Sequence, residues 1–488
     1  MIDLMLALAA ENQRNGDWAS AEILYRGLLK DHPGHPAAAL SLGGLLRERG
    51  DLEESGKFLG LAVDGAPDCS EAHIQQAQLW QALGKPDRAL QSLMIATSLQ
   101  GVKVNPNDVQ ARFALAVAFN RADHHRDAAA AYRQALALQP GFDEIHNNLG
   151  ISLQNLLRSD EAVTAHRRAV QVTPNNAGHH ANLAHALLAS GHLREGFAEW
   201  EWRTPSPKRD FTQPKWNGAP LVGKTLLAHA EQGYGDTIQF CRYLPLAAAR
   251  GGRVVVECRA PLSGLLRRMP GVSAVVEWGQ PLPHFDVQIA IPSLPFALGL
   301  DSVEPSAPYL KASAERLAFW KERAGAASFK VGLVWAGNAA GLDPKRAISA
   351  ADITRLADVP GVSLFSLQRD AELSNIGARL AEDFGPSIAD FDDLAAAIES
   401  LDLLISVDTA AAHLAGAMGK PVWTLLHASP DWRWLPASDT TPWYRSMRLF
   451  RQTAAGDWSN LVARVASELA GLSETRRKAA ARPAIEGR

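Results

Sequence analysis

The stretch LLISVDTAAAHLAGAMGKPVWTLL, residues 403–426, decides the fold of the second half of this chain. It begins with a short β-branched apolar run at 403–407, continues through small residues of helical character, and ends in a second apolar run at 422–426. Short apolar runs on either side of a helix are typical of buried parallel strands in an α/β sheet. Asp408 and Thr409 follow the first run directly. Because ligands of such sheets bind at the carboxyl ends of strands, we expect a ligand site here.

The same alternation of strands and helices extends back to residue 223. Further apolar runs of this length lie at 225–229, 253–258, 274–277, 287–291, 330–335 and 362–367. The segment 312–328 has no strand character and separates the runs into two groups. We therefore expect an α/β region of two doubly wound, Rossmann-like halves, at 223–325 and 326–470, which face each other across a cleft.

The first 200 residues follow a different period. Pro106, Pro140 and Pro174 are spaced by 34 residues, and Pro33 and Pro67 have the same spacing. Six units align from starts at Ile2, Pro36, Ser70, Val109, Asp143 and Ala177, with about five extra residues, 101–105, between the third and fourth. This period predicts an all-α solenoid of antiparallel helix pairs over residues 1–203. The pattern resembles the tetratricopeptide repeat.

Each unit has the residue sizes that close helix packing needs. Small residues stand near the start of each second helix, at Ala21, Ser55, Ala89, Ala128, Ala162 and Gly196. Bulkier groups follow four positions later, at Tyr25, Leu59, Leu93, Tyr132, His166 and Trp200. The first helices present leucines at one register, Leu8, Leu42, Leu115, Leu149 and Leu183. We expect the small residues where two helices cross and the large ones in the grooves between helices.

Two segments fit neither pattern. Residues 204–222, TPSPKRDFTQPKWNGAPLV, contain four prolines and predict a linker or an extended arm. Residues 471–488 form a basic tail that ends in Ile485-Glu486-Gly487-Arg488. This ending looks like a protease-site remnant, so we leave the last residues out of the fold prediction.

Composition limits the classes of function and location. The 488 residues include 49 Lys and Arg against 52 Asp and Glu, and a net charge of −3 argues against a partner held mainly by phosphate neutralisation, such as a DNA duplex. Cys69, Cys241 and Cys258 fit neither a disulfide framework nor a structural zinc site. The N-terminal stretch lacks the basic region of a signal peptide, and no apolar stretch reaches membrane-spanning length. We expect a soluble, cytoplasmic protein.

The loop after the first strand is the first candidate site. It contains Gly233 and Gly235 before an apolar helix, and these glycines let backbone approach a ligand closely. A GxG pattern without the third glycine is not a dinucleotide-binding fingerprint. Asp236 stands at the helix start, where it is either an N-cap or a general base.

The strand end at Asp408 has the features of a diphosphate site. Small residues open the following helix, so that its N–H groups and the positive end of its dipole face an anion. Thr409 either donates its hydroxyl to a phosphate or caps the helix. His413, one turn further on, is placed to face the same ligand.

Other polar residues of the second sheet are added to this candidate site. Asn338 and Gln368 come after strands ending near 335 and 367. Lys345 and Arg346 end a Gly-Leu-Asp-Pro-Lys-Arg loop, where they either neutralise phosphate charge or are solvated.

Two groups of residues suggest a metal but have simpler interpretations. Asp390, Asp392 and Asp393 directly precede an apolar helix, so we interpret them as a cap and expect no metal. Histidines of the repeats follow the repeat spacing, which favours solvated or packing roles for His146, His179, His180, His185 and His192.

Asn148 and Asn182 occupy the same register in successive repeats. There they either hydrogen-bond the backbone of an extended peptide on the concave face or are exposed polar residues.

Three blocks of the second half have a family resemblance. They are Gly235-Asp236-Thr237 with Pro245, residues 330–338, and Asp408-Thr409 with His413 and Gly419-Lys420-Pro421-Val422. Their order and spacing resemble the heptosyltransferases, nucleotide-sugar enzymes of the GT-B fold. Stretches 199–203, 229–233 and 430–434 are similar to a narrower bacterial group in which tetratricopeptide repeats precede such a half. That architecture is similar to repeat-containing flagellin glycosyltransferases and to O-linked N-acetylglucosamine transferase.

The resemblance implies roles for individual residues. Asp236 matches the catalytic aspartate of heptosyltransferases, and Lys345 or Arg346 matches their basic phosphate contact. Asp408, Thr409 and His413 match the donor diphosphate and sugar site. With Asn338 and Gln368, which are added from their positions after strands, the expected donor site comprises Asn338, Lys345, Arg346, Gln368, Asp408, Thr409 and His413. The expected acceptor site comprises Gly235 and the two asparagines of the repeats, Asn148 and Asn182. Ala410 stands where heptosyltransferases have glycine, which leaves less room for the ligand.

The resulting hypothesis is an inverting, metal-independent transfer of a sugar from a nucleotide donor to Ser or Thr of a protein bound by the repeats, with flagellin as a plausible acceptor. We expect no cofactor besides the nucleotide-sugar substrate, no nucleic acid partner and no membrane span. Two alternatives remain open. One is a non-catalytic repeat scaffold with a degenerate transferase half, and the other is a glycosyltransferase of the lipopolysaccharide type.

Overall fold

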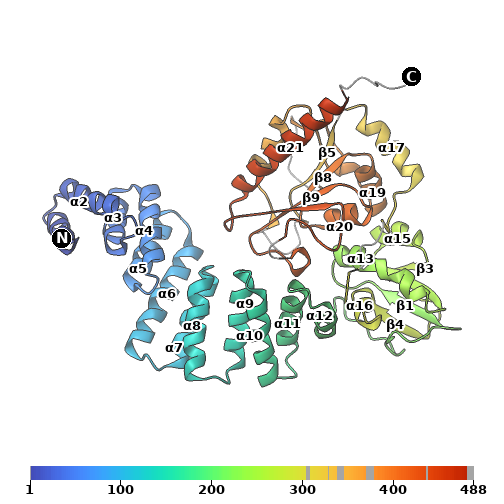
Figure 1. Cartoon of the computed structure of the whole chain (residues 1–488), viewed down its shortest axis with the longest axis horizontal. Coiled ribbons are helices and arrows are strands. Elements are labelled where there is room, and N and C mark those ends of the chain that lie inside the picture. Colours follow the sequence, from blue (N-terminus) through green and yellow to red (C-terminus); the bar gives the residue numbers. More distant parts are fainter. Residues whose placement is uncertain are drawn as a thin grey trace. The chain divides into compact units, whose positions relative to one another are not determined.

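A computed structural model describes residues 2–303, 308–327, 329–337, 346–369, 379–435 and 438–480 (Figure 1). The chain divides into two compact units, residues 1–179 and 180–488. Within the described ranges, no helix is both long and apolar enough to cross a membrane.

The repeat helices begin where the 34-residue period places them. The predicted starts are the first residues of α1 (Ile2–Arg14), α3 (Pro36–Arg49), α5 (Ser70–Ala82), α7 (Val109–Arg121), α9 (Asp143–Asn155) and α11 (Ala177–Ala189). The second helices are α2 (Trp18–Asp31), α4 (Leu52–Gly65), α6 (Pro86–Val104), α8 (His125–Leu138), α10 (Ser159–Val172) and α12 (Leu193–Trp200). The predicted helix pairs are therefore confirmed. The five extra residues lengthen α6 to 19 residues instead of forming a loop.

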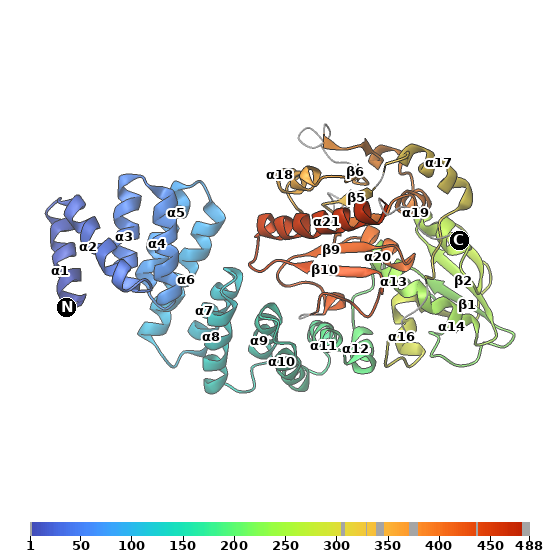
Figure 2. The ribbon, with the colours of Figure 1, turned by 45° about the horizontal axis from the view of Figure 1, so that its top comes forward.

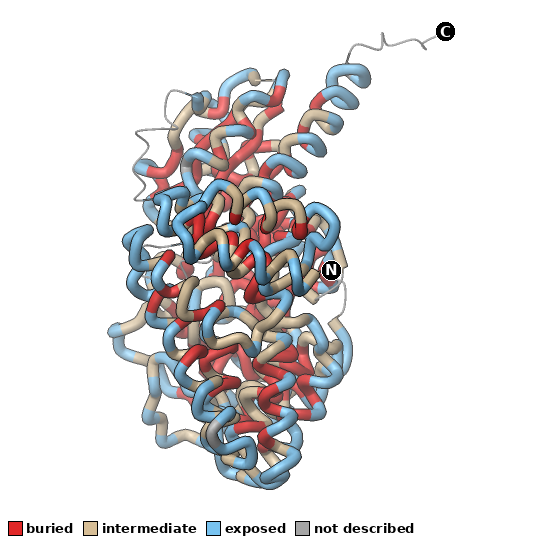
Figure 3. The backbone as a smooth tube through the Cα atoms, turned by 90° about the vertical axis from the view of Figure 1, so that its left-hand side faces the viewer, coloured by how far each residue is buried: buried red, intermediate tan, exposed pale blue. Residues whose placement is uncertain are grey.

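Close helix crossings explain the small residues. A Cβ atom at Gly43 would lie 2.7 Å from Cγ of Leu59, and one at Gly150 would lie 2.5 Å from the His166 ring. All six predicted small positions are buried. Two large positions are not buried as expected, because Leu8 is 48% exposed and Leu93 is 39% exposed. Figure 3 shows buried and exposed stretches alternating along the repeat helices.

The second unit contains two parallel sheets, and all eight predicted strands form. The first sheet has the order β3-β2-β1-β4, with β1 (Thr225–His229), β2 (Arg253–Cys258), β3 (Val272–Glu277) and β4 (Val287–Ala290). One face of this sheet packs on α13 (Tyr234–Phe240), α14 (Leu244–Ala248) and α15 (Ala260–Arg267). Phe211 and Phe285 cover part of the other face, at Leu227 and Val255.

The second sheet has the order β10-β9-β8-β5-β6-β7. Its strands are β5 (Lys330–Val334), β6 (Ser363–Ser366), β7 (Glu382–Asp383), β8 (Leu403–Val407), β9 (Val422–Leu426) and β10 (Met447–Arg451). Alternate strand residues pack on α19 (Phe391–Glu399) and α20 (Ala410–Ala417) on one face and on α21 (Trp458–Ala480) on the other (Figures 1 and 2). The sequence pattern missed β7, which has only two residues, and β10, whose run MRLFR is interrupted by arginines.

The proline-rich segment 204–222 is an extended arm on the first sheet. Lys215 forms a parallel bridge with Gln288 of β4, and the Trp216 N–H donates to the Gln288 carbonyl at 2.8 Å. The Trp216 side chain is buried. Phe197 and Trp200 of α12 belong to the same core as this sheet. The second compact unit therefore begins inside the last repeat, at residue 180, whereas the sequence pattern changes near residue 203.

The expected C-terminal tail is partly structured. Helix α21 continues to Ala480, ten residues into the segment 471–488. Ser473 donates its hydroxyl to the Pro360 carbonyl at 2.7 Å, and Arg476 pairs with Asp402 at 2.7 Å. These contacts attach the end of the helix to the second sheet's domain.

Candidate functional site

The structure brings the two predicted strand-end loops together through α13 and α20. A Cβ atom at Gly235 on α13 would lie 2.9 Å from Cδ2 of His413 on α20. Only a residue without a side chain allows the two helices to approach this closely. Residues from the first and second sheets therefore share one site.

Asp236 is the third residue of α13, and the N-cap of this helix is Gly233. Asp236 is therefore not the N-cap residue, which was one of the two alternatives that the sequence offered. Its Oδ2 accepts the Gly233 N–H at 2.9 Å, as an acidic residue at this place in a helix commonly does. Its Oδ1 accepts a hydrogen bond from Nη2 of Arg433 at 2.5 Å. The side chain remains 22% exposed, so both oxygens are oriented while the carboxylate stays accessible.

Arg433 connects the two halves of the second unit. It lies in the 3₁₀ turn η7 (Trp432–Trp434) and donates from Nη2 to Asp236, from Nη1 to Asp431 at 2.7 Å and from Nε to Gln239 at 2.5 Å. Burial alone would raise the pKa of Asp431, but the charge and hydrogen bonds of Arg433 outweigh it and hold that pKa at about 2. The result is a buried network of charge-assisted hydrogen bonds around Asp236.

Asp408 lies at the end of β8 and is more enclosed than Asp236, with a side chain 8% exposed. Burial raises its pKa, against the opposing charge of Arg346, whose Nη1 lies 3.0 Å from Oδ2 of Asp408. Thr409 is the N-cap residue of α20, and its hydroxyl lies 3.0 Å from the hydroxyl of Ser406. The N-terminus of α20 therefore lies directly after Asp408, which forms an ion pair with Arg346.

His413 is buried on α20. Its Nδ1 lies 2.8 Å from the Tyr444 hydroxyl, and its ring lies 5.1 Å from the Trp434 ring. Burial lowers the pKa of His413 to about 3. At neutral pH the imidazole is therefore uncharged.

Other predicted site residues have different surroundings. Gln368 holds the backbone after β5, because its Oε1 accepts the N–H groups of Trp335 at 3.1 Å and Ala336 at 3.0 Å. Asn338 and Lys345 lie outside the described residues.

The aspartates at 390–393 pair with arginines. Asp390 caps α19 by accepting the Asp393 N–H at 2.9 Å, as the sequence predicts. Asp392 pairs with Arg268, and Arg316 pairs with Asp390 and Asp393. Across the described ranges, no group of three or more His, Cys, Asp or Glu residues is placed to hold a metal ion.

The two asparagines of the repeats stand on separate helices. Asn148 lies on α9 and hydrogen-bonds the Tyr132 side chain, while Asn182 lies on α11.

His185, also on α11, has neighbours that the repeat spacing did not predict. Burial lowers the pKa of His185, and the charge of Asp431 opposes this effect. The His185 ring lies 5.0 Å from the Trp200 ring, which in turn lies 6.2 Å from the Trp432 ring of η7.

The extended arm holds the loop that carries Asp236. Arg203 pairs with the buried Glu231 at 2.8 Å. Gln232 has φ of 64°, a left-handed conformation unusual for a residue with a side chain. Its N–H donates to the Ser206 carbonyl at 2.8 Å, and its Nε2 donates to the Thr204 carbonyl at 2.9 Å. The arm thus supplies the partners that keep this loop in place.

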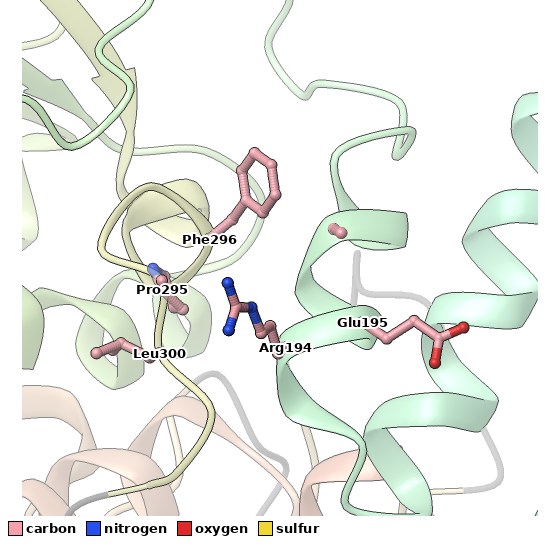
Figure 4. Close-up of a pocket in the computed structure, with 7 residues that line it drawn as sticks. Arg194, Glu195, Pro295, Phe296 and Leu300 are labelled. Atoms are coloured by element: carbon pink, nitrogen blue, oxygen red, sulfur yellow. The ribbon is translucent and has the colours of Figure 1, made fainter.

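Cavities lie beside this loop and the last repeat helix. One of about 180 Å³ is lined by Arg203, His229 and Glu231, among others. Another, of about 370 Å³, lies between α12 and the segment 295–300. In Figure 4, Arg194 points toward Phe296 in this cavity and Glu195 points away from it.

The sequence patterns predict no role for Asp431, Arg433 and Tyr444. The signal for the first two is the segment Pro430-Asp431-Trp432-Arg433-Trp434, whose aromatic residues and alternating charges are unusual for a surface loop.

Comparisons with known proteins match separate segments of the chain to two kinds of family. Residues 13–79 and 74–143 match tetratricopeptide repeat families, and residues 387–453 match glycosyltransferase family 9 (heptosyltransferase). The chain thus joins tetratricopeptide repeats to a heptosyltransferase-like glycosyltransferase domain.

Among individual proteins, the chain is similar to Protein FlbA of Caulobacter vibrioides, at 27% identity over 95% of this chain and 83% of FlbA. It is also 27% identical to human Protein O-mannosyl-transferase TMTC3, over 35% of this chain but only 20% of that protein. The crystal structure of a family 9 glycosyl transferase from Veillonella parvula aligns with 53% of this chain and 99% of that one, at 12% identity and a TM-score of 0.43. The match of residues 387–453 to a glycosyltransferase family supports a glycosyltransferase.

Proposed function

We propose that this protein is an inverting glycosyltransferase that moves a sugar from a nucleotide-sugar donor to a Ser or Thr hydroxyl of a protein acceptor. The observation that carries the proposal is the meeting of Asp236 and the N-terminus of α20 where Gly235 packs on His413. One loop offers an oriented, partly exposed carboxylate, and the other offers helix N–H groups next to a basic side chain.

In the reaction, Asp236 takes the proton of the acceptor hydroxyl. The acceptor oxygen then forms a bond to the anomeric carbon of the donor sugar while the bond from that carbon to the phosphate oxygen breaks. Attack from the face opposite the leaving group inverts the anomeric centre. The nucleotide leaves with its phosphate charge, and the proton remains on Asp236 until solvent removes it.

The donor side is assigned to the second sheet. The N–H groups of α20 and the cation of Arg346 favour a diphosphate, and no metal ion is needed for charge neutralisation. Asp408 holds Arg346 in place, and Thr409 and the uncharged His413 offer hydrogen bonds. We retain Gln368 as a residue that shapes the donor loop, and Asn338 and Lys345 as donor contacts proposed from their sequence positions.

The acceptor is assigned to the repeats. Repeat helices of this kind form surfaces that suit extended polypeptides, and Asn148 and Asn182 are the proposed backbone contacts, with Gly235 next to the reacting hydroxyl. The similarity to a protein O-mannosyl-transferase supports a protein acceptor. A flagellin is the first acceptor to test, and we place the reaction in the cytoplasm.

The direct experiment incubates purified protein with a panel of nucleotide sugars and a flagellin, and follows both nucleotide release and the mass of the acceptor. Transfer to a Ser or Thr residue supports the proposal. Binding of nucleotide sugars without turnover of any of them would favour a repeat scaffold with an inactive transferase half. Transfer to a lipopolysaccharide core but not to protein would favour the lipopolysaccharide alternative.

A further inference from the structure

We propose that Arg433 is a positioning residue that sets the catalytic base, so that Asp236 is ready only when the C-terminal half of the transferase lies against the N-terminal half. This inference rests on the proposed role of Asp236 as the base. It assigns a function to a residue that no sequence motif marked as part of the site.

The geometry of Arg433 supports this role. Its guanidinium donates to Asp236, Asp431 and Gln239 with three different nitrogens, and its side chain is only 9% exposed. Asp236 and Gln239 lie one turn apart on α13, whereas Asp431 belongs to the C-terminal half. The planar fork of an arginine fits such a set of acceptors, and a lysine does not. One side chain therefore fixes the base helix of one half to the loop of the other.

Packing keeps the guanidinium in one orientation. Arg433 lies over the Trp432 ring, 4.4 Å from its centroid, and the Phe240 ring of α13 lies 6.0 Å away. Stacking on an aromatic face adds attraction and removes rotational freedom. Because Oδ2 of Asp236 is already bound to the Gly233 N–H, the Arg433 contact to Oδ1 leaves the carboxylate a single orientation.

Two carboxylates share the charge of Arg433. Its Nη1 pairs with Asp431 at 2.7 Å and its Nη2 pairs with Asp236 at 2.5 Å. Removing Arg433 therefore leaves both carboxylates without their direct cationic partner.

The test compares Arg433→Gln, Arg433→Lys and a matched control, Arg242→Gln, in the full chain with a nucleotide-sugar donor and the protein acceptor. Arg242 is also buried and also joins the two halves, because it donates to the Trp443 carbonyl at 2.9 Å and the Tyr309 hydroxyl at 3.0 Å, but it does not bind Asp236. For Arg433→Gln we expect kcat to fall about 10²-fold, the size of effect that misplacement of a reacting group produces. The donor KM should change little.

The split between kcat and KM separates positioning from general structural damage. In Arg433→Gln the fall in kcat should leave the donor KM near wild type, because the donor contacts of the second sheet are unchanged. In Arg433→Lys kcat should also fall, since the charge remains but the planar fork that matches three acceptors is lost. In Arg242→Gln kcat should stay close to wild type, whatever its effect on melting temperature.

Two results would overturn the inference in different ways. If Asp236→Asn abolishes turnover but Arg433→Gln leaves kcat unchanged, Arg433 does not position the base and the proposed function stands. If Asp236→Asn itself retains full turnover, the base assignment fails and the inference fails with it.

Discussion

The loops that end β1 and β8 both place an aspartate at the start of a helix, yet they treat the carboxylate differently. Asp236 is 22% exposed, and its cation, Arg433, comes from the opposite half. Asp408 is 8% exposed, and its cation, Arg346, comes from its own half. The first arrangement orients a carboxylate and leaves it accessible, whereas the second encloses a carboxylate that holds Arg346 in place. The two aspartates thus differ in burial and in the origin of the counter-ion, and the proposed function assigns proton transfer to the first and donor binding to the second.

The largest expected effect is that of Asp236→Asn. Loss of general-base catalysis should lower kcat by about 10²–10⁴-fold. Asn keeps an oxygen that can accept the Gly233 N–H, so the melting temperature and donor affinity should stay near wild type. Steady-state kinetics measures kcat, calorimetric titration measures donor affinity and thermal unfolding gives the melting temperature. Undiminished turnover would show that Asp236 is not the base.

Asp408→Asn should act on binding before it acts on chemistry. Arg346 would lose its charged partner, and a hydrogen bond to a charged group contributes about 1.5–3 kcal/mol. We expect donor Kd to rise by about tenfold or more, since each 1.4 kcal/mol is a factor of ten. Calorimetric titration with the nucleotide sugar measures this Kd. An unchanged Kd with reduced kcat would give Asp408 a role in the chemical step instead.

Gly235→Ala tests the contact that joins the loops. The added Cβ would lie 2.9 Å from the His413 ring, which is buried and has little space to move. Overpacking of this kind typically costs about 1–3 kcal/mol, so unfolding in urea should occur at lower concentration. A suitable control is Gly141→Ala, at an exposed turn where nothing lies within 4 Å and φ is not positive. Equal losses in both variants would show that the Gly235 contact is loose.

The buried His413 predicts a pH-dependent stability. Its pKa of about 3 lies below the ordinary value near 6.5, so the unfolded chain binds a proton that the folded chain does not. Stability from the neutral imidazole is therefore present above pH 6.5 and is lost as the pH falls toward 3. At pH 5 the loss is about 2 kcal/mol relative to pH 7. Urea unfolding of wild type and His413→Gln at both pH values measures the difference, which should be smaller in the variant.

The smallest expected effect is that of metal removal. Phosphate charge is assigned to the α20 N-terminus and to basic side chains, so EDTA should leave turnover unchanged. A strict requirement for added magnesium or manganese would instead give Asp390, Asp392 and Asp393 a second role beside their arginine partners.

Regular patterns made much of the fold predictable. The 34-residue period located the starts of six helix pairs, and β-branched runs located eight strands, because both patterns depend on local spacing of apolar residues. The paired strand-end loops were predictable for the same reason. The edge strand β10 was not, because its arginines interrupt the apolar alternation.

The sequence by itself determined the repeat architecture, the two parallel sheets and the positions of Asp236 and Asp408 in the segments that follow strands, because each depends on the spacing of nearby residues along the chain. Only the tertiary structure decided that Arg433, 197 residues after Asp236, binds its carboxylate. It also decided that the arm at 204–222 contacts the loop before α13 and that His185 packs near Trp200. Such contacts depend on how separate helices and loops pack, and no local spacing of residues specifies that packing.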